Sequence, residues 1–210
     1  QFRELLDRLE NSGAKVLVTT GQLSHRLNGI RKKLPDLAHV ITVKELETIL
    51  PKQSEAARCA HTDPTDPAFM LYTSGTTGKP KGVVHAHQTI LSEHLTAKYV
   101  LDLKPDDVYW CTADPGWVTG VAYQILGTLS NAASTVIYAG RFDPKTWYKI
   151  IEKYRVTVWY SAPTAIRMLQ AGGDGLVRFH NLSSLRHLGS VGEPLNPEPL
   201  LWGQKVFKHP

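Results

Sequence analysis

A stretch dense in glycine, hydroxyl and lysine residues, residues 73–82, follows the short apolar run 68–72 and precedes a helix-compatible segment that begins near His85. A strand, a turn of small residues and a helix in this order form an anion site. Glycines let backbone N–H groups approach a ligand, hydroxyls donate hydrogen bonds, and lysines supply positive charge. The stretch therefore predicts a strand–loop–helix unit that holds phosphate groups, with an ordinary polar turn as the alternative.

This loop differs from the P-loop of nucleoside triphosphatases. A P-loop has four residues between its glycines and ends in Lys-Ser or Lys-Thr. Here Gly75 and Gly78 are separated by two residues, and Lys79 is followed by Pro80. The predicted ligand is thus a nucleotide polyphosphate that is held by a loop of another type.

The composition is typical of a folded protein and gives no sign of a nucleic-acid partner. Hydrophobic residues make up 42% and charged residues 20% of the 210 residues, which excludes a mainly disordered chain. The net charge is +5, but residues 31–33 are the only run of three basic residues. A nucleic-acid site needs basic residues clustered on one face. We interpret residues 31–33 as the solvated end of a helix, where cations complement the helix dipole.

The sequence predicts neither a membrane-spanning helix nor a signal peptide. No apolar run approaches the roughly eighteen residues that a membrane-spanning helix needs, and the first residues lack a signal-peptide pattern. Two cysteines, Cys59 and Cys111, do not make a disulfide framework, and Cys111 lies in an apolar run that predicts burial. These features indicate a reducing, cytoplasmic location.

Apolar runs of strand length alternate with segments of helical spacing along most of the chain. Strands are expected at 14–20, 38–43, 68–72, 107–112, 134–139, 156–160 and 185–191. Helices are expected at 2–10, 24–33, 44–50, 86–100, 117–129, 144–154, 163–170 and 197–207. The alternation predicts an α/β fold with mostly parallel, doubly wound sheets flanked by helices.

A proline-rich linker at 51–67 divides the chain into two predicted segments. Residues 1–62 would form a small βαβ-like segment, and residues 63–210 a nucleotide-binding α/β subdomain. Both ends resemble cut ends, so we expect the chain to be part of a longer protein. In such sheets ligands bind beyond the carboxyl ends of strands. Residues 73–82, 114–120 and 190–194 follow predicted strands, so we expect them to share one site.

Three of these motifs together resemble the adenylate-forming enzymes. Residues 72–82 (Tyr-Thr-Ser-Gly-Thr-Thr-Gly-Lys-Pro-Lys-Gly) are similar to the signature loop of that family, which contains acyl-CoA synthetases, luciferases and adenylation domains. Residues 117–120 (Trp-Val-Thr-Gly) and 190–194 (Ser-Val-Gly-Glu-Pro) narrow the resemblance to the acetyl-CoA synthetase branch. The resemblance is close over residues 69–207 and looser over residues 1–60.

The resemblance implies a two-step reaction. A carboxylate attacks the α-phosphate of ATP, and coenzyme A then takes the acyl group and releases AMP. The implied small-molecule substrates are ATP, acetate and coenzyme A, with Mg²⁺ beside the phosphates. The implied phosphate-binding residues are Thr73, Ser74, Gly75, Thr76, Thr77, Gly78, Lys79 and Lys81.

The other two motifs imply the rest of the site. Gly192, Glu193 and Pro194 resemble the stretch that lies along the adenine; an ordinary turn is the alternative interpretation. The implied lining of a small acyl pocket is Trp117, Val118, Thr119, Gly120 and Val191, with Thr119 also near coenzyme A. A buried core position is the alternative for Trp117. Such a pocket separates acids one methylene apart by only ~1–3 kcal/mol, so acetate and propionate both remain open.

Other motifs of the family do not fall within these residues. The adenylation lysine belongs to a carboxy-terminal domain of the family, and further adenylate contacts and the main coenzyme A-binding arginines also lie elsewhere. We therefore assign no catalytic residue within the chain and expect it to be inactive by itself. His85 with His87, and Cys59 with His61, are too sparse to predict a metal site. The alternative functions are another short-chain acyl-CoA synthetase and a nucleotide-binding module without chemistry.

Overall fold

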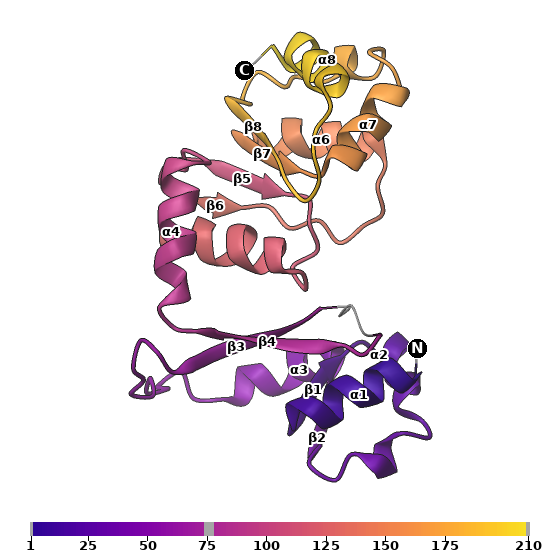
Figure 1. Ribbon diagram of the computed structural model, residues 1–210, viewed down its shortest axis with the longest axis vertical. Helices are drawn as coiled ribbons and strands as arrows, with labels where there is room; N and C mark the ends of the chain where they lie inside the picture. Colours follow the sequence, from indigo (N-terminus) through magenta and orange to yellow (C-terminus); the bar gives the residue numbers. More distant parts are fainter. Residues whose placement is uncertain (1, 74–77, 209–210) are drawn as a thin grey trace. The chain divides into compact units, whose positions relative to one another are not determined.

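The computed structural model describes residues 2–73 and 78–208, and the chain divides into two units, 1–87 and 88–210 (Figure 1). The division falls at 87/88, whereas the sequence suggested segments 1–62 and 63–210. The reason is that the strand at 67–73 pairs with a second strand at 81–86 and stays with the first unit. The Tyr72 hydroxyl also donates a hydrogen bond to Asn11 Oδ1 (2.8 Å). The roles assigned to the two predicted segments stay predictions.

Helix α1 (Phe2–Ser12) and a two-stranded parallel sheet begin the first unit. Strand β1 (Val16–Thr19) pairs with β2 (His39–Thr42), and α3 (Val43–Ile49) follows with a capping box between Thr42 and Glu45. Turn η3 (Leu50–Lys52) ends this part. Its buried core consists of leucine and isoleucine side chains: Leu9, Leu27, Ile30, Leu34 and Leu37.

The predicted helix at 24–33 is wrong. The segment instead forms three short turns, α2 (Gly21–Ser24), η1 (His25–Leu27) and η2 (Arg31–Lys33). The break lies at Asn28, whose ψ of 125° is not helical, and at Gly29, whose φ of +85° favours glycine. These turns place Leu27 and Ile30 in the core of the unit.

The predicted strand–loop–helix arrangement around residues 73–82 is also wrong. Strand β3 (Pro67–Thr73) is antiparallel to β4 (Lys81–Ala86), so a strand follows the predicted loop, and α4 begins only at Thr89. Phe69 lies opposite His85, and their rings stack with centroids 4.7 Å apart. This cross-strand pairing and the β-branched Val83 and Val84 favour a strand where a helix was expected.

A four-stranded parallel sheet, in the order β6-β5-β7-β8, organises the second unit and confirms the predicted fold class (Figure 1). Its strands are β5 (Val108–Cys111), β6 (Ser134–Thr135), β7 (Val158–Ser161) and β8 (His187–Ser190). The helices are α4 (Thr89–Tyr99), the π-helix η4 (Gly120–Gly127), α5 (Thr128–Ser130), α6 (Pro144–Tyr154), α7 (Pro163–Ala171), η5 (Val177–Phe179) and α8 (Pro197–Phe207).

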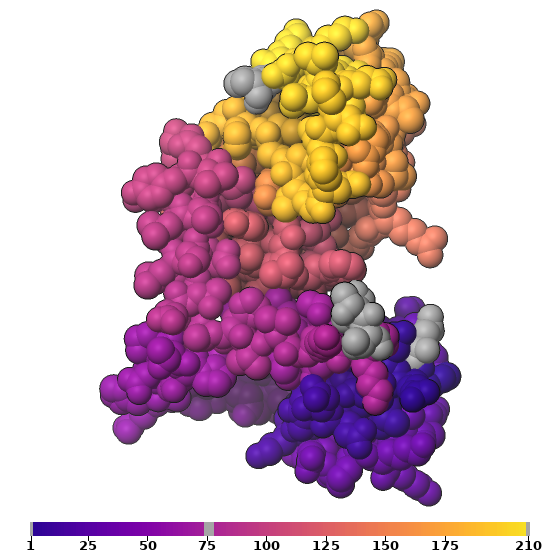
Figure 2. All heavy atoms as spheres, in the orientation of Figure 1, coloured from indigo at the N-terminus to yellow at the C-terminus, as the bar shows by residue number. Residues whose placement is uncertain are grey.

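Both faces of this sheet are covered, because successive strand residues point to opposite sides. Trp110 and Trp159 lie in a buried cluster with residues of α6, α7 and α8. Tyr109, Cys111 and Val158 lie in a second cluster with Ala97 of α4. In the space-filling view the yellow atoms of α8 lie against the orange atoms of α7 (Figure 2). The near-continuous apolar strands therefore result from burial on two sides.

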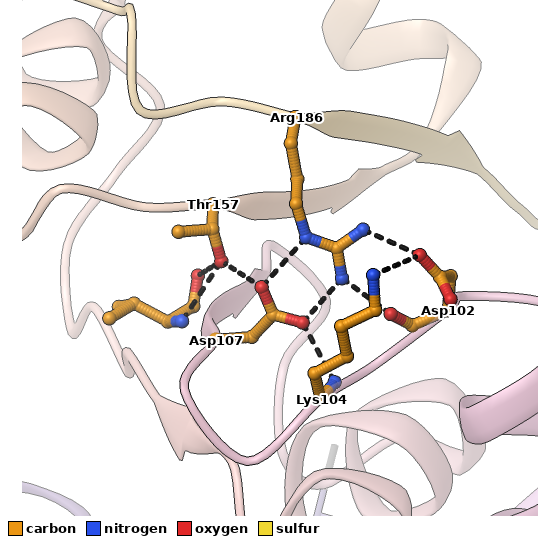
Figure 3. A network of polar contacts seen from close by, with 6 residues as sticks. Asp102, Lys104, Asp107, Thr157 and Arg186 are labelled. Carbon is orange, nitrogen blue, oxygen red and sulfur yellow. Dashed lines mark hydrogen bonds and ion pairs between the residues drawn. The ribbon is translucent and has the colours of Figure 1, made fainter.

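A charged network lies where three of the parallel strands begin (Figure 3). Arg186, just before β8, donates from Nε to Asp107 Oδ1 (2.9 Å) and from Nη1 to Asp102 Oδ2 (2.7 Å). Asp107, just before β5, also accepts from the Thr157 hydroxyl (2.7 Å) and from the Lys104 amide (2.8 Å). The network joins the starts of β5, β7 and β8, at the edge opposite to the carboxyl ends of the strands.

An acidic N-cap begins α6, as predicted. Asp143 accepts from the Thr146 amide (2.8 Å), which is one of the amides that the helix itself cannot satisfy. We expect Asp143→Ala to lower the free energy of unfolding by about 1 kcal/mol. Urea unfolding followed by tryptophan fluorescence measures this, because all five tryptophans belong to the second unit. Asp106→Ala, at an exposed position, is the matched control; an equal loss there would contradict the assignment.

Candidate functional site

The carboxyl ends of β5, β7 and β8 bring together two of the three predicted site segments. Cys111 pairs with Tyr160, and Ser161 pairs with Ser190, so these strands end at neighbouring levels. The Thr112 and Ser161 hydroxyl oxygens lie 2.7 Å apart at this edge. Residues 112–120 leave from β5 and residues 191–194 leave from β8. Parallel sheets bind ligands at this edge, which makes it the candidate site.

A tight turn carries the segment predicted to line the acyl pocket. The Asp114 side chain accepts from the Gly116 amide (2.7 Å), and the Asp114 carbonyl accepts from the Trp117 amide (2.9 Å). Gly120 approaches the same carbonyl so closely that a Cβ on it would lie 2.2 Å from the oxygen. The turn therefore requires glycine at position 120, where η4 begins.

The side chains of this turn are not part of the core. Trp117 is 72% exposed and Val118 is 54% exposed. The alternative interpretation of Trp117 as a buried core residue is therefore wrong. Thr119 and Val191 are half-buried. Trp117 and Val118 are therefore free of core contacts at this edge, and the assignment of these residues to an acyl pocket stays a prediction.

Glu193 in the second segment is held against α7. Its Oε1 accepts from the Thr164 amide (2.9 Å) and from the Thr164 hydroxyl, and it lies 2.8 Å from Arg167 Nη2. The Thr164 hydroxyl lowers the pKa of the Glu193 carboxyl most, and Arg167 lowers it further. Gly192 beside it has a φ of +99°, which favours glycine. The adenine-binding role of these residues stays a prediction.

Sequence reasoning missed Thr164 and Arg167. Helix α7 begins after Ala162, a residue without a side-chain acceptor, and Pro163 is its first residue. The next amide, that of Thr164, therefore needs an acceptor from elsewhere, and Glu193 supplies it. The sequence did offer one signal: Ala162 stands where a residue with a capping side chain is usual. This signal does not identify the acidic residue that caps the helix.

The predicted phosphate loop belongs to the first unit. Thr73 pairs with Lys81 across the hairpin, and Gly78 has a φ of +83°. Lys79 and Lys81 are exposed, and neither forms an ion pair with a carboxylate among the described residues. The remaining predicted phosphate-binding residues, Ser74, Gly75, Thr76 and Thr77, lie outside the described residues.

The part of the chain that the structure describes has few residues that could ligate a metal ion or react as a thiol. It holds no group of three His, Cys, Asp or Glu residues that could ligate a metal ion. His85 lies in β4 rather than on the predicted helix and stacks on Phe69. Cys111 is buried, and burial raises the pKa of its thiol, whereas Cys59 is exposed. Across residues 2–73 and 78–208, no helix is both long and apolar enough to cross a membrane.

Comparison with known proteins places the chain in a family. The model of the AMP-binding enzyme family matches residues 2–210. The chain belongs to the AMP-binding enzyme family. It is 51% identical over 96% of its length to an acetyl-coenzyme A synthetase of Bacillus subtilis and 38% identical over 97% to one of Deinococcus radiodurans. It spans 36% of the length of each of these relatives.

Solved structures give the same fold. All of the chain matches an acyl-CoA synthetase of Brucella canis with a TM-score of 0.90 and 28% identity, over 39% of that protein. An anthranilate CoA ligase in complex with anthranoyl-AMP matches with a TM-score of 0.90 and 25% identity, over 42% of its length. Family membership and fold thus confirm the resemblance drawn from the three motifs.

Proposed function

We propose that the chain is part of an AMP-forming acetate:CoA ligase. The observation that carries this proposal is the 51% identity to the Bacillus subtilis acetyl-coenzyme A synthetase, which extends over 96% of the chain. The exposed turn at 114–120 and the 191–194 segment lie at one sheet edge and support it, because parallel sheets bind ligands at that edge. The activity belongs to the whole protein, of which this chain is about a third by the length of its relatives.

The first half of the reaction requires the negative charge of ATP to be held while a carboxylate approaches the α-phosphorus. In this proposal Lys79 and Lys81 hold the β- and γ-phosphates together with the amides and hydroxyls of residues 73–78. Both lysines are exposed and without ion-pair partners among the described residues, so their charge is available to a ligand. Mg²⁺ is usually held by substrate phosphates, water and one or two carboxylates, which fits a site without a three-carboxylate cluster in the described residues.

The second half of the reaction transfers the acyl group to the sulfur of coenzyme A. We assign Trp117, Val118, Thr119, Gly120 and Val191 to the acyl pocket, and Thr119 also to the approach of coenzyme A. In this proposal the bulky side chains of Trp117 and Val118 would exclude long acids by size. Another short-chain acid remains the alternative substrate, because an apolar pocket separates neighbouring acids by only ~1–3 kcal/mol.

Further parts of the proposal concern the whole protein. Its remaining length would include a carboxy-terminal domain that supplies the adenylation lysine. Its partners would be small molecules, since the basic residues of this chain are scattered along the sequence. The absence of a disulfide framework in the sequence supports a cytoplasmic location.

The lysine pair tests the nucleotide part of the proposal. We expect Lys79→Ala/Lys81→Ala in the whole protein to weaken ATP·Mg²⁺ binding about tenfold or more at low salt, because two charges that face the phosphates are lost. Titration calorimetry measures this. Lys32→Ala/Lys33→Ala is the matched control, since it removes the same charge from the same unit. Equal losses in both variants would show only a general charge effect.

Acid-dependent pyrophosphate exchange into ATP tests the chemistry. We expect the whole protein to catalyse this exchange with acetate and the double lysine variant to lose most of it. Faster pyrophosphate exchange with propionate than with acetate would identify the alternative short-chain acid as the substrate. ATP binding without exchange for any short acid would favour a nucleotide-binding module.

A further inference from the structure

The loops that follow β7 and β8 leave the sheet side by side. Ser161 is paired with Ser190, and the Val191 amide donates to the Ser161 carbonyl (3.3 Å), so the parallel pairing reaches the ends of both strands. Thr164 and Glu193 each lie three residues beyond this pair, and they are hydrogen bonded to each other. Their contact therefore continues the alignment of the two strands into the candidate site.

One oxygen of Glu193, Oε1, makes three polar contacts with α7. The Thr164 amide and hydroxyl donate to Oε1, and the Arg167 guanidinium lies 2.8 Å from it. Arg167 also donates to the Thr164 hydroxyl (3.3 Å), so the three side chains form a closed group, the Glu193 cluster. The Thr164 amide belongs to the first turn of α7, where a carboxylate is favourable with respect to the helix dipole.

We propose that the Glu193 cluster is a positioning device for the nucleotide segment, and that Thr164 and Arg167 act on the nucleotide through Glu193 without touching it. The Glu193 side chain is hydrogen bonded to α7 although it is 41% exposed, and Gly192 and Pro194 on either side of it are exposed as well. This assignment rests on the proposed function, because it assumes that residues 192–194 meet the nucleotide. It adds two residues of α7 and changes the role of Glu193 from ligand to anchor.

The arrangement has a physical reason in the backbone. Gly192 has a φ of +99°, a conformation that glycine adopts readily, and glycine restricts its own backbone less than any other residue. A Cβ at Gly192 would meet nothing within 4 Å, so no packed atom lies on that side of the residue. The anchor at Glu193 supplies the missing constraint, and a segment that is already in place loses less entropy when the ligand binds.

Kinetics of the whole protein separate positioning from direct contact. We expect Arg167→Met to raise the KM for ATP about fivefold, with little change in kcat or in the KM for acetate, since one partly exposed ion pair is lost. Thr164→Val should act in the same direction. Arg178→Met, at an exposed arginine of the same unit without a hydrogen bond or ion pair among the described residues, is the matched control and should leave all constants unchanged.

A double-mutant cycle gives the decisive outcome. If Arg167 acts through Glu193, then Glu193→Gln/Arg167→Met raises the KM for ATP no more than the larger single effect. Multiplying effects, or a large effect of Glu193→Gln with none of Arg167→Met, would make Glu193 a direct ligand and overturn the proposal. Unchanged thermal unfolding of the variants excludes a general loss of structure. A wild-type protein without acetate-dependent exchange would instead contradict the proposed function itself.

Discussion

Replacement of Asp107 by alanine is expected to lower the free energy of unfolding of the second unit by about 3 kcal/mol. Asp107 is 3% exposed and accepts hydrogen bonds from Arg186, from the Thr157 hydroxyl and from the Lys104 amide (Figure 3). Alanine would leave these donors without their acceptor in a partly buried place, which costs more than the pair itself contributes. Urea unfolding followed by tryptophan fluorescence measures the loss.

Asp102 provides the matched control in the same network. It contacts the other side of the Arg186 guanidinium (2.7 Å), but its side chain is 58% exposed. Exposed ion pairs contribute little, so Asp102→Asn, which keeps a residue type suited to the positive φ of 51° at this position, should cost less than about 1 kcal/mol. Equal effects of the two replacements would show that burial is not what makes Asp107 important. In a double-mutant cycle, Asp107→Ala and Arg186→Met should couple strongly, because the two side chains touch.

The same pair gives stability a defined dependence on pH. Burial raises the pKa of Asp107, but the hydrogen bonds from Arg186, Thr157 and the Lys104 amide outweigh burial and hold the pKa below its usual range. The unfolded chain therefore takes up the proton at higher pH than the folded chain. The stabilisation that ionised Asp107 gives the folded state is fully present above the usual pKa of an aspartate, roughly 4. It is lost as the pH falls through the lower pKa of the folded state. The stability gap between wild type and Asp107→Asn should shrink over that acidic range.

The sequence predicted the second unit well because its signals are local. Apolar runs such as 156–160 indicated doubly covered strands, and the Asp143-Pro144 pair indicated the start of α6; both are confirmed. The hairpin of β3 and β4 was missed, because the pairing of Phe69 with His85 depends on residues far apart in the chain. The 24–33 segment failed for another reason: one glycine with positive φ interrupts an otherwise helical pattern.

The candidate site was predictable in its motifs and not in its supporting contacts. Residues 114–120 and 191–194 could be placed at the carboxyl ends of strands from periodicity alone, and the structure brings them to one sheet edge. The contact of Glu193 with Thr164 could not be predicted from the sequence, because it depends on the register between β7 and β8. The loop at 73–82 was assigned to phosphate by its composition, which says nothing of the hairpin that carries it.

Replacement of Gly120 by alanine is expected to have the largest effect on the proposed activity. A Cβ at this position would lie 2.2 Å from the Asp114 carbonyl oxygen and 2.7 Å from the Pro115 Cα, both of them backbone atoms that no rotamer change can move. The turn must therefore open, at a cost of about 2–3 kcal/mol in stability. Trp117 and Val118 would move with it, because the Trp117 amide bonds to the Asp114 carbonyl.

Displacement of the turn should cost more in catalysis than in folding. If residues 117–119 line the acyl pocket, a shift near 1 Å misplaces the acid relative to the α-phosphate and can lower the rate about 100-fold. We expect acetate-dependent pyrophosphate exchange by the whole protein to fall to that degree in Gly120→Ala, while ATP binding changes little. Gly116→Ala is the matched control, since its Cβ would lie 3.1 Å from Asp114 Oδ1, the end of a side chain that can move aside. Full exchange activity in a folded Gly120→Ala protein would place the acyl pocket away from this turn.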